Sequence, residues 1–171
     1  QWPLLWLTGA SFLLLTGYGR ALGGSGSLSG TAAAVVPRVL GRVDASGVID
    51  TSTALTDFAD ANNPRSAVST QGTDVWLAGG AGGVRFATLG ASTSTQINAA
   101  PTNFRQLAIV DGQLLVSTSS GSSFRLAEVA SGLPTDAGQT LVNLPGLPTN
   151  SGSPYAYVFF DLSVAVPGVD T

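Results

Sequence analysis

The residues of this chain that could do chemistry are arginines, aspartates and hydroxyl-bearing side chains. All seven basic residues are Arg, and the chain contains no His, Cys or Lys. A Ser or Thr nucleophile needs a neighbouring base, and its usual partners, His and Lys, are absent. Paired carboxylates could still act as acid and base, but Glu128 is the sole Glu and most Asp residues lie in turn sequences. We therefore expect the chain not to be an enzyme.

A loop at residues 56–64, TDFADANNP, holds the best candidate for a metal site. Asp57, Asp60, Asn62 and Asn63 place four oxygen-bearing side chains close together. Calcium takes about six to eight oxygen ligands of these kinds. The loop lacks the D-x-D-x-D-G pattern, and a solvated loop has the same composition. A calcium site and a plain surface loop both stay open, and no other cofactor is expected.

Three arginines recur in similar contexts and could form a binding surface. Arg42, Arg85 and Arg125 lie in GRVDASG, VRFATLG and FRLAEVASG, 43 and 40 positions apart. On one interpretation they bind anionic ligands such as polysaccharide carboxylates. On the other, which we favour, their stems pack between structural units and their charges pair with local acids such as Asp44 or Glu128.

The elements that position these residues are short β-strands. The stretch Arg65–Leu89 has Val-, Trp- and Phe-containing runs separated by Gly-rich turns, the pattern of consecutive antiparallel strands. No segment has a sustained 3.6-residue apolar period, so we expect essentially no helix. The expected strands are Phe12–Thr16, Val39–Val43, Gly47–Thr51, Arg65–Thr70, Asp74–Ala78, Val84–Leu89, Thr93–Ile97, Phe104–Val110, Gln113–Thr118, Phe124–Val129, Gln139–Leu144 and Tyr155–Leu162.

This order of strands repeats with a period that predicts the architecture. Arg65 and Arg105 begin equivalent first strands and are 40 positions apart. Four strands per roughly 40–45 residues is the period of a propeller blade. We therefore predict an all-β fold of consecutive four-stranded antiparallel meanders, a partial β-propeller of about three blades plus a partial one. The predicted units of this one domain are residues 11–63 with a Gly/Ser-rich insertion at 19–37, 64–103, 104–153 and 154–171.

Composition favours an extracellular protein. Only 10% of residues are charged, below the roughly 25% of a typical soluble domain, and the formal net charge is −3. The chain has no basic field that would attract nucleic acid. Its most apolar segment, within residues 1–15, is shorter than the roughly 20 residues of a membrane span. Residues 1–10 could be a strand or a signal remnant, and we expect the protein to be secreted or displayed at the cell surface.

Several blade-like motifs resemble a known family. NNPRSAVSTQGTDVWLAGGAGGVRFATLGASTSTQI, GQLLVSTSSGSSFRLAEVASG and SGSPYAYVFFDL are similar to segments of large secreted bacterial propeller-like proteins. The resemblance covers roughly residues 11–171. It implies a repeat propeller with further extracellular regions, and it carries over no catalytic residue, because the family has no clear assigned activity.

Two classes of function follow from these observations. The chain is either a non-catalytic extracellular scaffold or binding segment, or a fragment of an extracellular hydrolase whose catalytic residues lie in missing blades. Its expected partners are the remaining blades or a second copy, with an extracellular polysaccharide or protein as ligand. Because YAYVFFDLSVAV and WPLLWL are apolar and few charges protect the ends, we expect the chain to self-associate.

Overall fold

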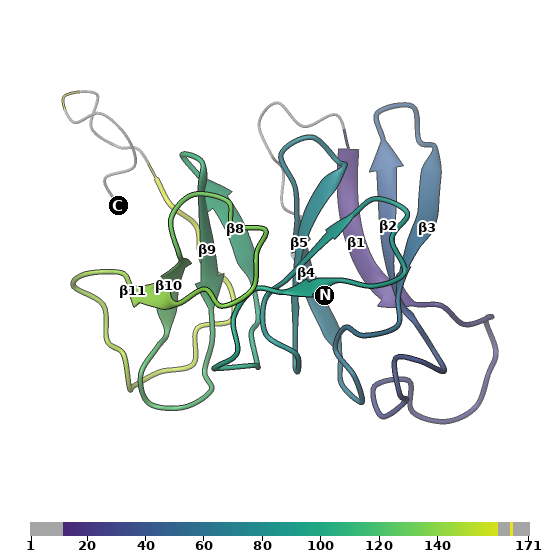
Figure 1. Ribbon diagram of the computed structural model, residues 1–171, viewed down its shortest axis with the longest axis horizontal. Coiled ribbons are helices and arrows are strands. Elements are labelled where there is room, and N and C mark those ends of the chain that lie inside the picture. Colours follow the sequence, from purple (N-terminus) through teal and green to yellow (C-terminus); the bar gives the residue numbers. More distant parts are fainter. Residues whose placement is uncertain (1–11, 161–164, 166–171) are drawn as a thin grey trace.

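The computed structural model describes residues 12–160 and residue 165, and this part of the chain forms β-strands and no helix (Figure 1). The all-β prediction is therefore confirmed. The strands are β1 (Phe12–Tyr18), β2 (Arg38–Asp44), β3 (Ile49–Leu55), β4 (Pro64–Val68), β5 (Asp74–Gly79), β6 (Arg85–Thr88), β7 (Thr95–Gln96), β8 (Leu107–Val110), β9 (Gln113–Ser117), β10 (Leu126–Val129) and β11 (Leu141–Asn143).

Three antiparallel sheets follow one another along the chain, and each consists of strands that are neighbours in sequence. The first sheet has the order β1-β2-β3, the second β4-β5-β6-β7 and the third β8-β9-β10-β11. They lie side by side in Figure 1, with the second sheet in the middle. The third strands of the two four-stranded sheets, β6 and β10, lie within the expected strands Val84–Leu89 and Phe124–Val129. The first sheet has three strands within the described residues rather than four.

Glycines make the tight turns between the strands. The β5–β6 turn contains Gly83 at φ 74°, a left-handed conformation that side chains other than glycine rarely adopt. A Cβ atom at this position would lie 2.5 Å from the backbone oxygen of Asn98. The turn therefore needs glycine both for its backbone conformation and for the close approach of the segment that follows β7.

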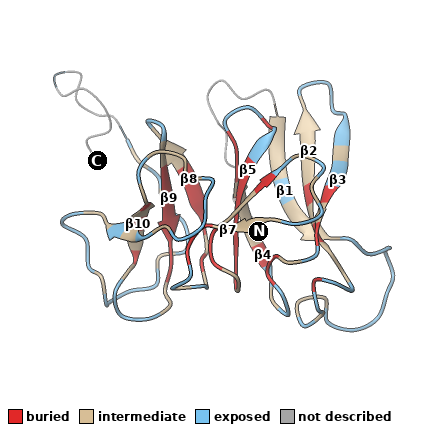
Figure 2. Ribbon diagram, viewed as in Figure 1, coloured by how far each residue is buried: buried red, intermediate tan, exposed pale blue. Residues whose placement is uncertain are grey.

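The core runs through the middle of the molecule in two hydrophobic clusters. The strands β5 and β9 are buried along almost their whole length (Figure 2). One cluster joins the second and third sheets and includes Trp76, Phe104 and Leu114; the other joins the first and second sheets and includes Leu40 and Phe58. Each sheet thus buries one face against the next sheet, as aromatic and aliphatic strands require.

One expected strand does not form within the described residues. Residues 155–160 form no strand, although Tyr155–Leu162 was expected to be one, and positions 161–162 lie outside the described residues. Tyr157 and Phe159 contact each other edge to face, with ring centroids 5.6 Å apart. Residues 19–37 connect β1 to β2 without a strand, in line with the predicted insertion. The alternatives for residues 1–10 also fall outside the described residues.

Candidate functional site: arginines at the junctions between the sheets

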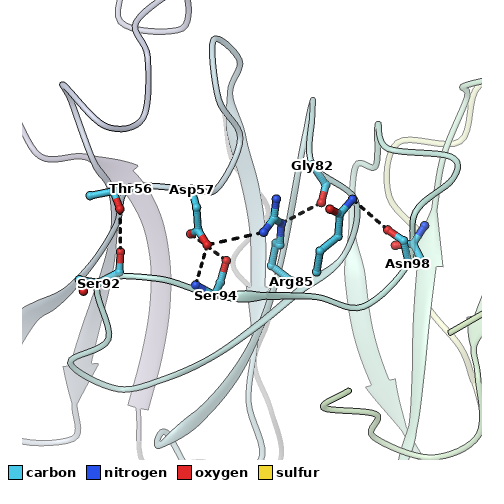
Figure 3. Close-up of polar contacts among 8 residues, drawn as sticks. Thr56, Asp57, Gly82, Arg85, Ser92, Ser94 and Asn98 are labelled. Atoms are coloured by element: carbon cyan, nitrogen blue, oxygen red, sulfur yellow. Dashed lines mark hydrogen bonds and ion pairs between the residues drawn. The ribbon is translucent and has the colours of Figure 1, made fainter. Parts of the chain in front are cut away.

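A polar network joins the loop after β3 to the second sheet (Figure 3). The backbone N–H of Ser94 donates to Asp57 Oδ2 over 2.9 Å, and the Ser94 hydroxyl donates to Asp57 Oδ1 over 3.0 Å. Arg85 Nη1 lies 3.7 Å from Asp57 Oδ2, and Arg85 Nε donates to the carbonyl of Gly82. The Asp57 carboxylate therefore fixes the segment before β7 and pairs with the arginine that begins β6.

The four residues of the predicted calcium loop have separate partners. Asp60 Oδ1 accepts from the backbone N–H of Ala33, Asn62 Oδ1 accepts from the N–H of Asn63, and Asn63 Oδ1 accepts from the Tyr18 hydroxyl. The described residues contain no group of three or more His, Cys, Asp or Glu side chains that could hold a metal ion. In the structure, side-chain oxygens of this loop accept hydrogen bonds from neighbouring segments of the chain.

The three arginines considered as an alternative anion-binding surface direct their guanidinium groups mainly at backbone carbonyls. Arg125 is only 8% exposed and donates to the carbonyls of Gly121, Phe124, Ser151 and Gly152. Arg42 Nη1 donates to the Gly72 carbonyl, and its Nε is buried without a partner. The Arg85 side chain is 13% exposed, and burial lowers its pKa while Asp57 opposes that shift. These contacts support the interpretation that the three arginines hold loops in place.

The acid that pairs with these arginines is not one of those expected. Asp57, rather than Asp44 or Glu128, forms the ion pair that the described residues contain. Asp44 instead accepts from the backbone N–H groups of Ser46 and Val48 in the β2–β3 turn. An aspartate beside a turn satisfies nearby amides first, which explains why sequence proximity alone chose the wrong partner.

Arg38 is a buried arginine to which no sequence motif points. It begins β2, is 1% exposed, and donates to the carbonyls of Thr31, Val36, Ala59 and Asn62 and to the Thr31 hydroxyl. Its guanidinium carbon also lies 5.0 Å from the centre of the Tyr18 ring. Burial lowers the pKa of Arg38, while Tyr18 and Asp60 oppose the shift. A single side chain thus ties the insertion and the loop after β3 to the first sheet.

Arg65 and Arg105 lie together where the second and third sheets meet. Arg65 Nη1 donates to Asn103 Oδ1 over 2.6 Å and to the Phe104 carbonyl, directly before Arg105, over 2.7 Å. Arg105 Nη2 donates to the Ser119 hydroxyl, and its guanidinium carbon lies 5.1 Å from the centre of the Tyr155 ring. The sequence marked the two arginines as repeat positions, and their 40-residue spacing was the one available signal that neighbouring units would bring them together.

Successive first strands of the sheets contact one another in a similar way. β1 contacts β4, and β4 contacts β8. The backbone N–H of Leu107 in β8 donates to the Ser66 hydroxyl in β4. Gln106 in turn binds the backbone of Tyr157 on both sides, donating to its carbonyl and accepting from its N–H. Residues 155–157 thus meet β8 much as β8 meets β4, although they form no strand.

The outer parts of the sheets are also joined alike. The segment before β7 binds the last strand of the first sheet, through donation from the N–H of Ala54 to the Ala91 carbonyl. The segment before β11 binds the end of the second sheet, where the N–H of Gln139 donates to the Ile97 carbonyl. Each junction therefore combines contacts between first strands with a backbone hydrogen bond near the last strand.

No family model, curated protein or solved structure matches this chain. Among the residues that the structure describes, no helix is both long enough and apolar enough to cross a membrane. The arrangement at the junctions can bind carbonyl and carboxylate oxygens through guanidinium groups. The carboxylate of the ion pair in the described residues, Asp57, is bound by Ser94 and Arg85.

Proposed function

We propose that this chain is a run of β-propeller blades that serves as a non-catalytic scaffold or binding segment outside the cell. In this proposal the three sheets are successive blades, and the first strand of each blade lies nearest a common axis. The remaining blades would be supplied by further parts of the same protein or by a second copy. The sequence resemblance to large secreted bacterial propeller-like proteins is in keeping with this assignment.

The observation that carries the proposal is the recurrence of one kind of junction. Consecutive meanders contact through β1 and β4 and then through β4 and β8. At each junction, the segment before the last strand of the later sheet also forms a backbone hydrogen bond in or directly after the last strand of the earlier sheet. In a propeller every blade must bury its apolar face against its neighbours by the same contacts. In a sandwich of unrelated sheets, the same contacts would not be expected to recur at each junction.

The non-catalytic part of the proposal is supported by the chemistry of the side chains. The chain lacks the His, Cys and Lys that activate nucleophiles. The Asp57 carboxylate is held by two hydrogen bonds and an ion pair, which suits the fixing of loops better than proton transfer.

An activity screen tests this part directly. The purified chain and its Asp57→Asn variant are compared on chromogenic esters, phosphate esters and glycosides. We expect no turnover that distinguishes the two proteins. Turnover by the natural chain that disappears in Asp57→Asn would contradict a non-catalytic scaffold and would favour a hydrolase.

A further inference from the structure

The arginine pair Arg65 and Arg105 combines two like charges with unused hydrogen-bond donors. A guanidinium group carries five N–H donors. Within the described residues, the Arg65 guanidinium donates side-chain hydrogen bonds through Nη1 alone, and the Arg105 guanidinium donates through Nη2 alone, to the Ser119 hydroxyl. None of the unused donors of Arg65 and Arg105 is among the buried atoms that lack a hydrogen-bond partner in the described residues, whereas Arg42 Nε is. The remaining donors of the pair therefore face solvent.

The electrostatic environment of the pair is unusual for an acidic chain. The protein has ten acidic residues and seven arginines, yet the one ion pair within 4 Å in the described part joins Arg85 to Asp57. Burial lowers the pKa of Arg65 and the charge of Arg105 lowers it further, while Tyr155 opposes both effects. Among the described residues, no carboxylate lies within 4 Å of either guanidinium group. The two like charges repel each other, and a bound anion would relieve that repulsion.

We propose that Arg65 and Arg105, with the exposed residue Tyr155, form a binding site for an oxyanion of the kind that acidic polysaccharides carry. The planar guanidinium fork matches a carboxylate or sulfate group, to which it donates two parallel hydrogen bonds. Asn103 accepts a hydrogen bond from Arg65 and Ser119 accepts one from Arg105, and the Tyr155 ring, in a residue that is 44% exposed, lies beside the Arg105 guanidinium group. This site is independent of the propeller assignment, because it needs only the junction of β4, the segment before β8 and Tyr155.

The experiment is a titration of the full chain followed by NMR at the arginine Nε–H groups. With seven arginines the spectrum is simple, and each signal is assigned from a single substitution. The probes are sodium sulfate, glucuronate and polygalacturonate, with neutral dextran as the blank. We expect saturable shifts of the Arg65 and Arg105 signals with the anions and none with dextran. The relative affinity for sulfate and glucuronate then distinguishes sulfated from uronic-acid polymers.

The variants separate binding from structure. Arg105→Gln should weaken anion affinity about tenfold, the value of one charge-assisted interaction, whereas Arg20→Gln, on the exposed insertion, should leave it unchanged. Arg105→Lys keeps the charge but loses the fork, and we expect an intermediate affinity. Circular dichroism checks folding, and if Arg105→Gln does not fold, Arg105→Lys and the signal assignment in the natural chain decide. Anion shifts confined to other arginines, or equal affinity in the Arg105 variants, would overturn the site.

Discussion

Replacing Arg38 by methionine removes all the guanidinium donors that bind four surrounding backbone carbonyls, while keeping much of the side-chain volume. The carbonyls of Thr31 and Ala59 retain a second donor, from the N–H groups of Ala61 and Asn62. Those of Val36 and Asn62 have no other donor among the hydrogen bonds of the described residues. The substitution therefore leaves two partly buried acceptors without a partner among the described residues.

The expected destabilisation follows from those two acceptors. An unsatisfied buried carbonyl costs about 1–3 kcal/mol. Part of this loss is offset, because the substitution also removes a charge that is buried without a carboxylate partner and is costly to keep out of water. We expect Arg38→Met to lower the free energy of unfolding by about 3 kcal/mol, and the melting temperature by roughly 6–12 °C for a chain of this size.

A lysine at the same position distinguishes the geometry of the fork from its charge. Arg38→Lys keeps the positive charge, but its single ammonium group cannot reach all the carbonyls that the planar guanidinium group contacts on several sides. We therefore expect Arg38→Lys to be at least as destabilising as Arg38→Met. Urea unfolding followed by tryptophan fluorescence measures both, since Trp76 is buried. The control is Arg20→Met on the exposed insertion, which should change stability by less than about 0.5 kcal/mol. Full stability of Arg38→Lys, or a loss below about 1 kcal/mol in Arg38→Met, would refute the reasoning.

Three further predictions follow from particular contacts. Gly83→Ala should lower the free energy of unfolding by about 3 kcal/mol or more, because it adds a clash with the Asn98 backbone to an unfavourable φ. The control Gly47→Ala has the unfavourable φ but open space around the Cβ atom, and should lower it by about 1 kcal/mol. Equal urea midpoints for the two variants would contradict this prediction. Burial raises the pKa of Tyr157, so the folded chain keeps a proton that the unfolded chain loses above its ordinary value of 10.0, and stability should fall as pH rises beyond that value. Tyr157→Phe should lessen the alkaline loss and, by removing a buried hydroxyl without a partner, leave stability at neutral pH unchanged or higher; an unaltered alkaline profile would count against it. Val158 and Phe160 are 68% and 53% exposed, so sedimentation at micromolar concentration should show self-association that Val158→Ser with Phe160→Ser reduces, and a monomeric natural chain would exclude this interface.

The strands were predictable because their signals are local. Glycine turns and alternating apolar residues lie within each hairpin, and the strands expected around Trp76 and Leu114 are those that form. The segment expected as a strand at Tyr155–Leu162 has the same local signal, but residues 155–160 have no partner strand among the described residues. Its aromatic content alone was therefore insufficient, since a strand also needs a neighbour.

The candidate sites were harder to predict because they depend on contacts between distant segments. Arg38 donates to a carbonyl 24 positions away, and Arg65 donates to one 39 positions away. Backbone carbonyls are present at every residue, so the sequence does not show which of them an arginine will reach. Similar sequence contexts pointed to Arg42, Arg85 and Arg125 as candidates, whereas the 40-residue spacing marked Arg65 and Arg105 only as repeat positions. The unused donors of Arg65 and Arg105, from which the anion site is inferred, are defined only in the folded chain.

An experimental structure of the chain tests most directly whether the sheets are successive blades. Superposing β4–β7 on β8–β11, and then the first sheet on the second, yields the rotation that relates each pair of neighbours. The account predicts nearly equal rotations about one common axis near β4 and β8, of roughly 45–90° for four to eight blades. Rotations of clearly different size, or axes that do not coincide, would contradict it.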